Sequence, residues 1–187
     1  MINISDYDKS FTESTFKSKV DNMFVMLYTS IMLQDLTRVD HYIGDDLYKK
    51  YENKIKKLME SNQRQMYDEL NVKSTEILNA EVEDDKIIIK VLIVSRYLDY
   101  TIDKSTGRMV AGNRDSRVQR NNYLTLEKKI NAHELGISRK CPSCGANMDI
   151  NYSGKCEYCG SIFNTEEYDY VITKLDEDYV DAMRGVR

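Results

Sequence analysis

The sequence has no tryptophan, one proline, no cysteine before residue 141 and no long apolar run. Its densest apolar stretch, residues 87–94, is short and contains Lys90, so no segment approaches the roughly 20 apolar residues that a membrane helix needs. The opening residues, MINISDYDKSF, include acids and no apolar run, so we expect no secretory signal. We find no internal repeat, Walker loop, dinucleotide fingerprint, nucleophile elbow or HExxH motif.

The charge composition also narrows the function classes. The 187 residues include 27 Lys and Arg and 31 Asp and Glu, with 41% hydrophobic residues, which is ordinary for a soluble globular protein. Residues 1–130 hold 21 basic and 21 acidic side chains, so the net charge of −4 arises entirely from residues 131–187. Because no large basic face can be built from these totals, nucleic-acid binding that ignores sequence is disfavoured.

Three helices are predicted in the first 60 residues. Ser10 and Glu13 can form a capping box ahead of an apolar stripe with a spacing of three and four residues. That stripe comprises Phe16, Val20, Met23, Phe24, Leu27 and Ile31. A short second helix is expected over Asp35–Ile43, with Leu36, Val39 and Ile43 facing inward and Gly44 taking the left-handed conformation at its end. A third helix should begin after Asp45 or Asp46 and run past Met59.

The following residues change to a strand pattern. Strands are predicted over residues 72–82, 86–103, 108–111 and 118–129, where β-branched and aromatic residues are frequent. Turns are expected at Asp84-Asp85 and at Lys104–Gly107. Helices followed by an antiparallel meander indicate an α+β fold, in which N-terminal helices pack on one face of a curled antiparallel sheet.

The four cysteines form the strongest motif. Cys141 and Cys144 in CPSCG, and Cys156 and Cys159 in CEYCG, give two C-x2-C pairs separated by eleven residues. Two such pairs can supply four thiolates to a closed tetrahedral site, which is typical of structural zinc and leaves no open position for catalysis. Iron, two disulfides and a redox CxxC are the alternatives, but the spacing favours Zn(2+) and a reducing, cytosolic compartment.

These signals divide the chain into four parts. We predict a helix-plus-sheet domain at 1–130, a linker at 131–138, a zinc ribbon at 139–175 and an acidic tail at 176–187, which is expected to fray. Basic residues and Tyr152 and Tyr158 flank the cysteines, and so do several acids. Structural packing of the two tyrosines is therefore favoured over contact with nucleic acid.

Other candidate residues have an ordinary structural explanation. His41 has no second histidine for a dyad, and Asp99 is expected to form an ion pair at a strand end. The lysines at 49–57 could touch an anionic membrane, although a solvated helix face is the default. A group of four arginines could bind an anion, although a solvated hairpin is the default. This group comprises Arg108, Arg114, Arg117 and Arg120.

Three stretches carry a resemblance to a known family. VDNMFVMLYTSIMLQDLTRVDHYIGDDLYKKYE (20–52), RQMYDELNV (64–72) and SRYLDYTIDKSTGRMVAGN (95–113) resemble the Tim44-like domain of the nuclear transport factor 2-like (NTF2-like) superfamily. Bacterial members are similar in ending with a zinc ribbon, here CPSCGANMDINYSGKCEYCG followed by EEYDYVITKL. The resemblance implies a cone-shaped domain with a pocket. It supplies no catalytic residues, and only the four cysteines match a functional motif.

The mitochondrial namesake of the family tethers a heat-shock chaperone to an import channel. The segment that serves this role there has no counterpart in this sequence, so the import role is not carried over. We therefore expect a non-enzymatic binding or scaffold protein that has an apolar pocket, a ribbon for an unidentified protein partner and a weak tendency to contact the inner face of the membrane. The alternatives are a cone-fold enzyme using Asp99, Asp35 or His41, and nucleic-acid binding through the ribbon.

Overall fold

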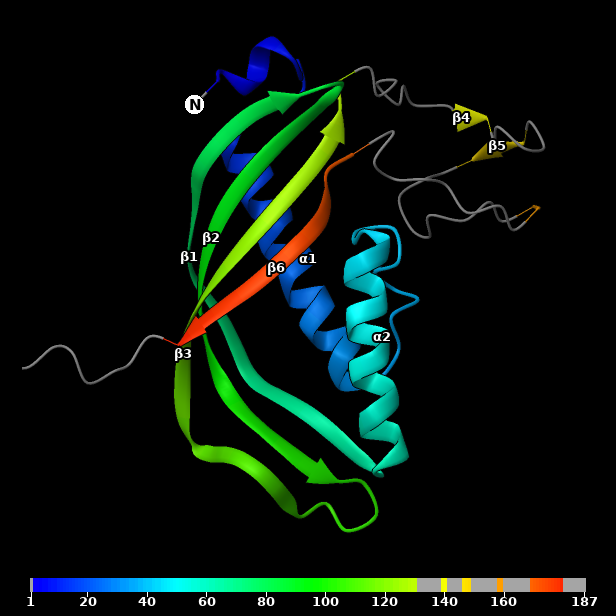
Figure 1. Cartoon of the computed structure of the whole chain (residues 1–187), viewed down its shortest axis with the longest axis vertical. Coiled ribbons are helices and arrows are strands. Elements are labelled where there is room, and N and C mark those ends of the chain that lie inside the picture. The colour runs from blue at the N-terminus through cyan, green and yellow to red at the C-terminus, as the bar shows by residue number, and fades with distance from the viewer. Residues whose placement is uncertain (1, 131–138, 141–145, 149–157, 160–168, 180–187) are drawn as a thin grey trace, which may run out of the picture.

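A computed structural model describes residues 2–130, 139–140, 146–148, 158–159 and 169–179. Two α-helices pack on a curled, four-stranded antiparallel sheet, which confirms the predicted α+β class (Figure 1). The strand order in the sheet is β1-β2-β3-β6. The predicted zinc ribbon falls largely outside the described residues.

Three long strands make up most of the sheet: β1 (Gln63–Glu83), β2 (Lys86–Asp103) and β3 (Met109–Lys129). The bounds of β2 are those predicted, and both predicted turns are present, with Gly107 at φ 68°. Strand β1 begins earlier than predicted. The prediction of two separate strands at 108–111 and 118–129 was wrong, because β3 continues between them through an irregular stretch.

Helix α1 (Glu13–Leu33) carries the predicted apolar stripe, all of it buried against the sheet. Its N-cap is Thr12, whose side chain accepts a hydrogen bond from the Thr15 amide, so the predicted capping box with Ser10 was wrong. Ser10 instead donates its hydroxyl and its amide to Asp8. Helix α2 (Asp45–Glu60) begins at Asp45, directly after its N-cap Gly44 and one or two residues before the predicted start.

The predicted helix at Asp35–Ile43 is absent from this described part of the chain, and consecutive turns replace it. Leu36, Val39 and Ile43 are nevertheless buried, as their spacing predicted. The backbone here bonds both to itself, within the turns, and to the sheet: the Ile172 amide donates to the Tyr42 carbonyl, and the Gly44 amide donates to the Ile172 carbonyl. Gly44 has a φ of −71° as the N-cap of α2, so its predicted left-handed conformation was also wrong.

The fourth strand, β6 (Val171–Tyr179), comes from beyond the cysteine segment. The sequence assigned these residues to the end of the ribbon and to a fraying acidic tail, but they pair with β3, for example Leu124 with Leu175. Ile172 and Leu175 are buried in the main core. The cysteine segment is therefore an insertion between two neighbouring strands of one sheet, and the helix-plus-sheet domain does not end at residue 130.

The sheet bends sharply about halfway along its long strands, so that its lower half curls beneath α2 (Figure 1). Pairing between β1 and β2 slips between Asp68 and Asn71, and pairing between β2 and β3 slips between Tyr97 and Asp99. Such bulges bend a strand and increase its twist. No helix in the described residues is long and apolar enough to cross a membrane.

Candidate binding site

Four tyrosines from four different elements meet in the core between the helices and the sheet. Tyr28 of α1, Tyr51 of α2, Tyr67 of β1 and Tyr97 of β2 are each at most 5% exposed, and we call them the tyrosine cluster. The rings of Tyr28, Tyr67 and Tyr97 contact one another, with centroid distances of 4.7, 5.5 and 5.7 Å. Tilted and edge-on contacts of this kind stabilise aromatic pairs beyond the area that they bury.

The hydroxyl of Tyr28 is tied to the last strand. It donates to the carboxylate of Glu177 at 2.6 Å and lies 3.2 Å from the side-chain oxygen of Asn122. Asn122 is fully buried and donates to the Ile93 carbonyl and to the Ser95 hydroxyl. Glu177 is exposed on β6 and still reaches a buried hydroxyl of α1, so β6 supplies an acceptor that the interior needs.

Lys54 approaches the cluster from α2. Its ammonium donates to the Tyr67 hydroxyl at 2.7 Å and lies 5.5 Å from the centre of the same ring. Burial lowers the pKa of Lys54, and the nearby carboxylates of Glu177 and Asp99 oppose this effect. Lys54 is therefore part of the interior network and not of a solvated helix face.

Asp99 forms the predicted ion pair on β2. Its carboxylate accepts from the guanidinium of Arg120 at 3.0 Å and from the amide of Gln65 at 2.8 Å. The Arg120 side chain is 4% exposed, so this pair is partly withdrawn from water. Beside the tyrosine cluster, the negative charges of Asp99 and Glu177 thus equal the positive charges of Lys54 and Arg120.

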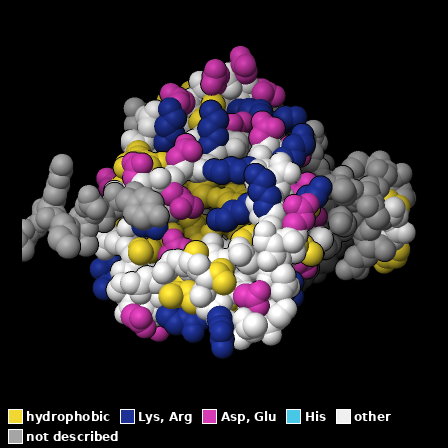
Figure 2. All heavy atoms as spheres, turned by 60° about the horizontal axis from the view of Figure 1, so that its bottom comes forward, with side chains coloured by type: hydrophobic (Ala, Val, Ile, Leu, Met, Phe, Trp, Pro, Cys, Tyr) yellow, Lys and Arg dark blue, Asp and Glu magenta, His cyan; other side chains and the backbone are white. Residues whose placement is uncertain are grey.

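The end of the molecule that holds the β2–β3 turn is hollowed. Figure 2 looks toward the end that holds the β2–β3 turn and shows a depression with a hydrophobic floor, with basic and acidic side chains around its rim. Burial raises the pKa of Tyr51, Tyr67 and Tyr97 far above the ordinary value, so their hydroxyls stay protonated at neutral pH. A protonated hydroxyl cannot abstract a proton, so the tyrosine cluster offers no general base.

The three predicted catalytic candidates do not come together. Asp35 is exposed and accepts hydrogen bonds from the amide and hydroxyl of Thr37, which lower its pKa. The ring of His41 lies against Tyr42 and 3.3 Å from the Asp40 carboxylate, in the turns before α2. Only Asp99 lies beside the tyrosine cluster, and its carboxylate is already occupied by two donors.

The predicted arginine group does not form one site either. Arg120 is buried and pairs with Asp99, Arg114 lies over the Tyr100 ring at 4.8 Å, and Arg117 pairs with Glu69. The lysines of α2 likewise divide: Lys50 donates to the Leu175 carbonyl and Lys54 reaches inward, while others on α2 stay exposed.

Three of the four predicted zinc ligands lie outside the described residues: Cys141, Cys144 and Cys156. Cys159 is described, and it is exposed in a turn. No group of metal-ligating side chains is found among the described residues. The short pair β4 (Arg139–Lys140) and β5 (Asn147–Met148) brackets the first C-x2-C pair as a two-stranded antiparallel unit.

Sequence reasoning missed the tyrosine cluster, Lys54 and Glu177 as site residues. One signal was available: the chain has 14 tyrosines against 4 phenylalanines and no tryptophan. Several of these tyrosines occupy positions in apolar stripes where phenylalanine would pack equally well. Tyrosines at such positions are expected to be buried, and a buried hydroxyl needs a hydrogen-bond partner. No local pattern indicated that Glu177 would be one of those partners.

Comparison with known proteins agrees with the resemblance noted in the sequence. Residues 1–136 match the model of the family described as Tim44-like domain, which is well over half of the chain. No curated protein matches the chain.

Proposed function

Because the chain belongs to the Tim44-like domain family, we propose that it is a non-enzymatic binding protein whose hollow, at the end of the molecule that holds the β2–β3 turn, takes up a small molecule or segment with an apolar body. A Tim44-like domain itself suggests a binding or scaffold role. The occupant would lie on the hydrophobic floor, and its polar atoms would meet the balanced charges of the rim.

One observation carries this proposal over the enzyme alternative. Asp99, the acid–base candidate beside the cluster, accepts from both Arg120 and Gln65, and the neighbouring Lys54 is engaged with the Tyr67 hydroxyl. A general base needs an accessible lone pair within reach of the proton that it removes. The arrangement therefore favours holding a ligand over transforming it.

Titration with a fluorescent alkyl-chain probe tests the proposal. We expect saturable binding with one probe per chain, and the tyrosine emission of this tryptophan-free protein should change with it. Lys54→Met removes the inward ammonium and leaves the Tyr67 hydroxyl without this partner, and it should shift the probe's affinity by about tenfold, which corresponds to about 1.4 kcal/mol.

Lys56→Met is the matched control, because Lys56 lies on the exposed side of the same helix. It should bind the probe as the wild type does. Probe binding that never saturates, or turnover of a small molecule that Asp99→Asn abolishes, would refute the proposal.

The same proposal includes a structural zinc ion held by the four cysteines and a ribbon surface that contacts a protein partner. Two features support it: the complete pair of C-x2-C motifs, and the β4–β5 pairing on either side of the first of them. Four thiolates close the coordination sphere, so the ion would organise the segment without taking part in chemistry.

Elemental analysis of the purified chain tests this part. We expect one zinc per chain, lost in Cys144→Ser and retained in the neighbouring control Ser143→Ala. Metal-free protein with two disulfides would overturn the zinc site, and with it the argument for a reducing, cytoplasmic location. Contact with the inner face of a membrane is also part of the proposal and would use the lysines of α2 that stay exposed, among them Lys49, Lys56 and Lys57.

A further inference from the structure

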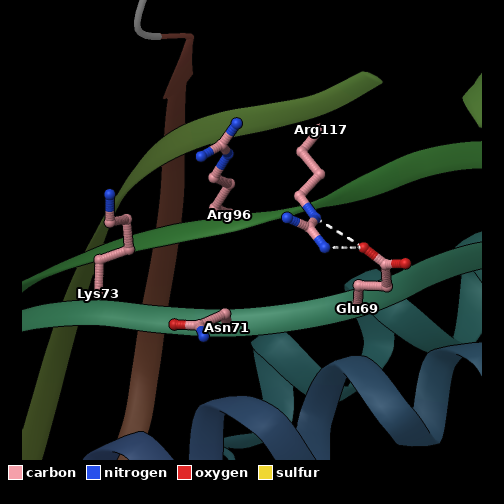
Figure 3. Close-up of a pocket in the computed structure, with 5 residues that line it drawn as sticks. All are labelled: Glu69, Asn71, Lys73, Arg96 and Arg117. Atoms are coloured by element: carbon pink, nitrogen blue, oxygen red, sulfur yellow. Dashed lines mark hydrogen bonds and ion pairs between the residues drawn. The ribbon is translucent and has the colours of Figure 1, made fainter. Parts of the chain in front are cut away.

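A second concave site lies on the outer face of the sheet, where the long strands bend. It has a volume of about 190 Å³ and is lined by Glu69, Asn71, Lys73, Arg96 and Arg117. Figure 3 shows these side chains on neighbouring strands β1, β2 and β3, with Arg117 reaching toward Glu69. We call this site the outer groove.

The bulges of the bend explain why these side chains gather. Two of the three register shifts between β1 and β2 lie here, between Asp68 and Asn71 and between Val72 and Ser74. Glu69, within the first slip, has a φ of 57°, a left-handed conformation that a non-glycine residue adopts only at a cost. Bulges redirect side chains and are frequent next to functional sites.

The charges of the outer groove are unbalanced. The Glu69 carboxylate accepts a hydrogen bond from the Nε of Arg117 at 2.6 Å. The groove therefore has one carboxylate for three cations, which are Lys73, Arg96 and Arg117. Within the described part of the chain, neither Arg96 nor Lys73 has a hydrogen-bond or ion-pair partner. The cross-strand neighbours of Arg96 are the uncharged amides of Asn71 and Gln119. An excess of two positive charges thus gathers here on a chain whose net charge is −4.

We propose that the outer groove binds a phosphoryl anion. The planar guanidinium of Arg96 presents paired N–H donors that match phosphate oxygens, Lys73 adds a point charge, and the side-chain amide of Asn71 can donate as well. A dianionic group would neutralise the excess charge. The phosphoryl group could belong to a soluble phosphate ester or to a lipid headgroup, and the chemistry of recognition is the same for both.

Calorimetric titration with inorganic pyrophosphate at low ionic strength tests the soluble source. We expect binding that weakens steeply with added salt, because the site is exposed. Arg96→Gln should weaken it about tenfold or more, since charge-assisted hydrogen bonds are lost. Glu69→Gln should strengthen it severalfold by releasing Arg117. Lys9→Gln, at an exposed position in the N-terminal segment ahead of α1, removes the same charge elsewhere and should leave affinity unchanged.

Vesicle sedimentation tests the lipid source. The protein is mixed with phosphatidylcholine vesicles that either contain or lack phosphatidic acid. Binding that requires phosphatidic acid and is lost in Arg96→Gln would show that the outer groove binds a lipid headgroup. Thermal unfolding of each variant checks the fold, which Arg96→Gln should leave intact because this side chain is exposed. If the wild type binds neither pyrophosphate nor phosphatidic acid vesicles, or if Arg96→Gln binds as well as wild type, the proposal is wrong.

Discussion

Replacing Asp8 with asparagine should destabilise the fold by about 2–4 kcal/mol, because Asp8 joins segments that are distant in sequence. Its carboxylate accepts from the Lys128 ammonium at 2.7 Å and from the Tyr170 hydroxyl at 3.1 Å. The Asp8 and Lys128 side chains are only 5% and 13% exposed. Lys128 is the second-last residue of β3 and Tyr170 precedes β6, so Asp8 holds together the two ends of the inserted cysteine segment.

The magnitude follows from removing one charge of a nearly buried pair. Asparagine can still accept hydrogen bonds, but the ammonium of Lys128 loses its counter-charge, a loss that exceeds the value of an ordinary hydrogen bond. For a chain of this length, about 2–4 kcal/mol corresponds to a melting temperature lower by about 5–15 °C. Urea and thermal unfolding followed by circular dichroism would measure both quantities.

The pH dependence gives a second test of the same pair. Burial alone would raise the pKa of Asp8, but hydrogen bonds from Lys128 and Ser10 outweigh it and hold the pKa below its ordinary 3.8. A lowered pKa in the folded state contributes stability above the unfolded value, and this contribution is lost as pH falls through the folded pKa. The penalty of Asp8→Asn should therefore be full at neutral pH and shrink below about pH 3.8.

Asp115→Asn is the matched control, since Asp115 is exposed and should change stability by less than about 0.5 kcal/mol. Lys128→Met should also destabilise the protein. The double variant with Asp8→Asn should lose less stability than the sum of the two single losses, because the two side chains interact directly. If Asp8→Asn unfolds within about 0.5 kcal/mol of the wild type at pH 7, the reasoning about this pair fails.

Three further predictions concern the core and the bend. Gly112→Ala should destabilise the protein by about 3 kcal/mol or more in urea unfolding, because Gly112 has a φ of 84° and an added Cβ would collide with the Asp99 carbonyl. Gly107→Ala should cost only about 1 kcal/mol, because a Cβ there meets open space. Equal losses for the two would contradict this. Tyr28→Phe should cost about 1–2 kcal/mol by taking this donor from the buried Asn122 oxygen and from the Glu177 carboxylate, against little change for the more exposed Tyr123→Phe. Burial raises the pKa of the buried tyrosines, so phenolate absorbance should show that they ionise only when the protein unfolds. The free energy of unfolding should therefore decline as pH rises above about 10. Titration of all 14 tyrosines in the folded state would refute this.

Elements with a strong local signal were predicted well. Strand β2 has the predicted bounds because its β-branched and aromatic residues alternate between the core and the outer face. Helix α1 follows from its apolar stripe, although the capping residue was wrong by two positions, since Thr12 and Ser10 are both good caps. The ion pair of Asp99 was also expected, but its partner, Arg120, was assigned to a solvated hairpin.

Elements that depend on distant partners were predicted poorly. The turns at 35–43 were expected to be a helix, because their apolar spacing fits one; the backbone instead bonds to Ile172, far along the chain. The acidic sequence of β6 is typical of a frayed terminal segment, and it forms a strand because it pairs with β3. The candidate site depends on the same strand, because Glu177 reaches Tyr28 across 149 positions of sequence.

The order of side chains along the chain thus determined the α+β class, the apolar faces of the two helices and the course of β2, since each follows from periodicity within about twenty residues. The tertiary structure alone decided that the cysteine segment is an insertion, that four tyrosines share one interior and that three cations meet outside the bend. The physical reason is that hydrogen-bonded pairing between remote strands, and the bulges that shift it, gain their free energy from partners that no local window contains.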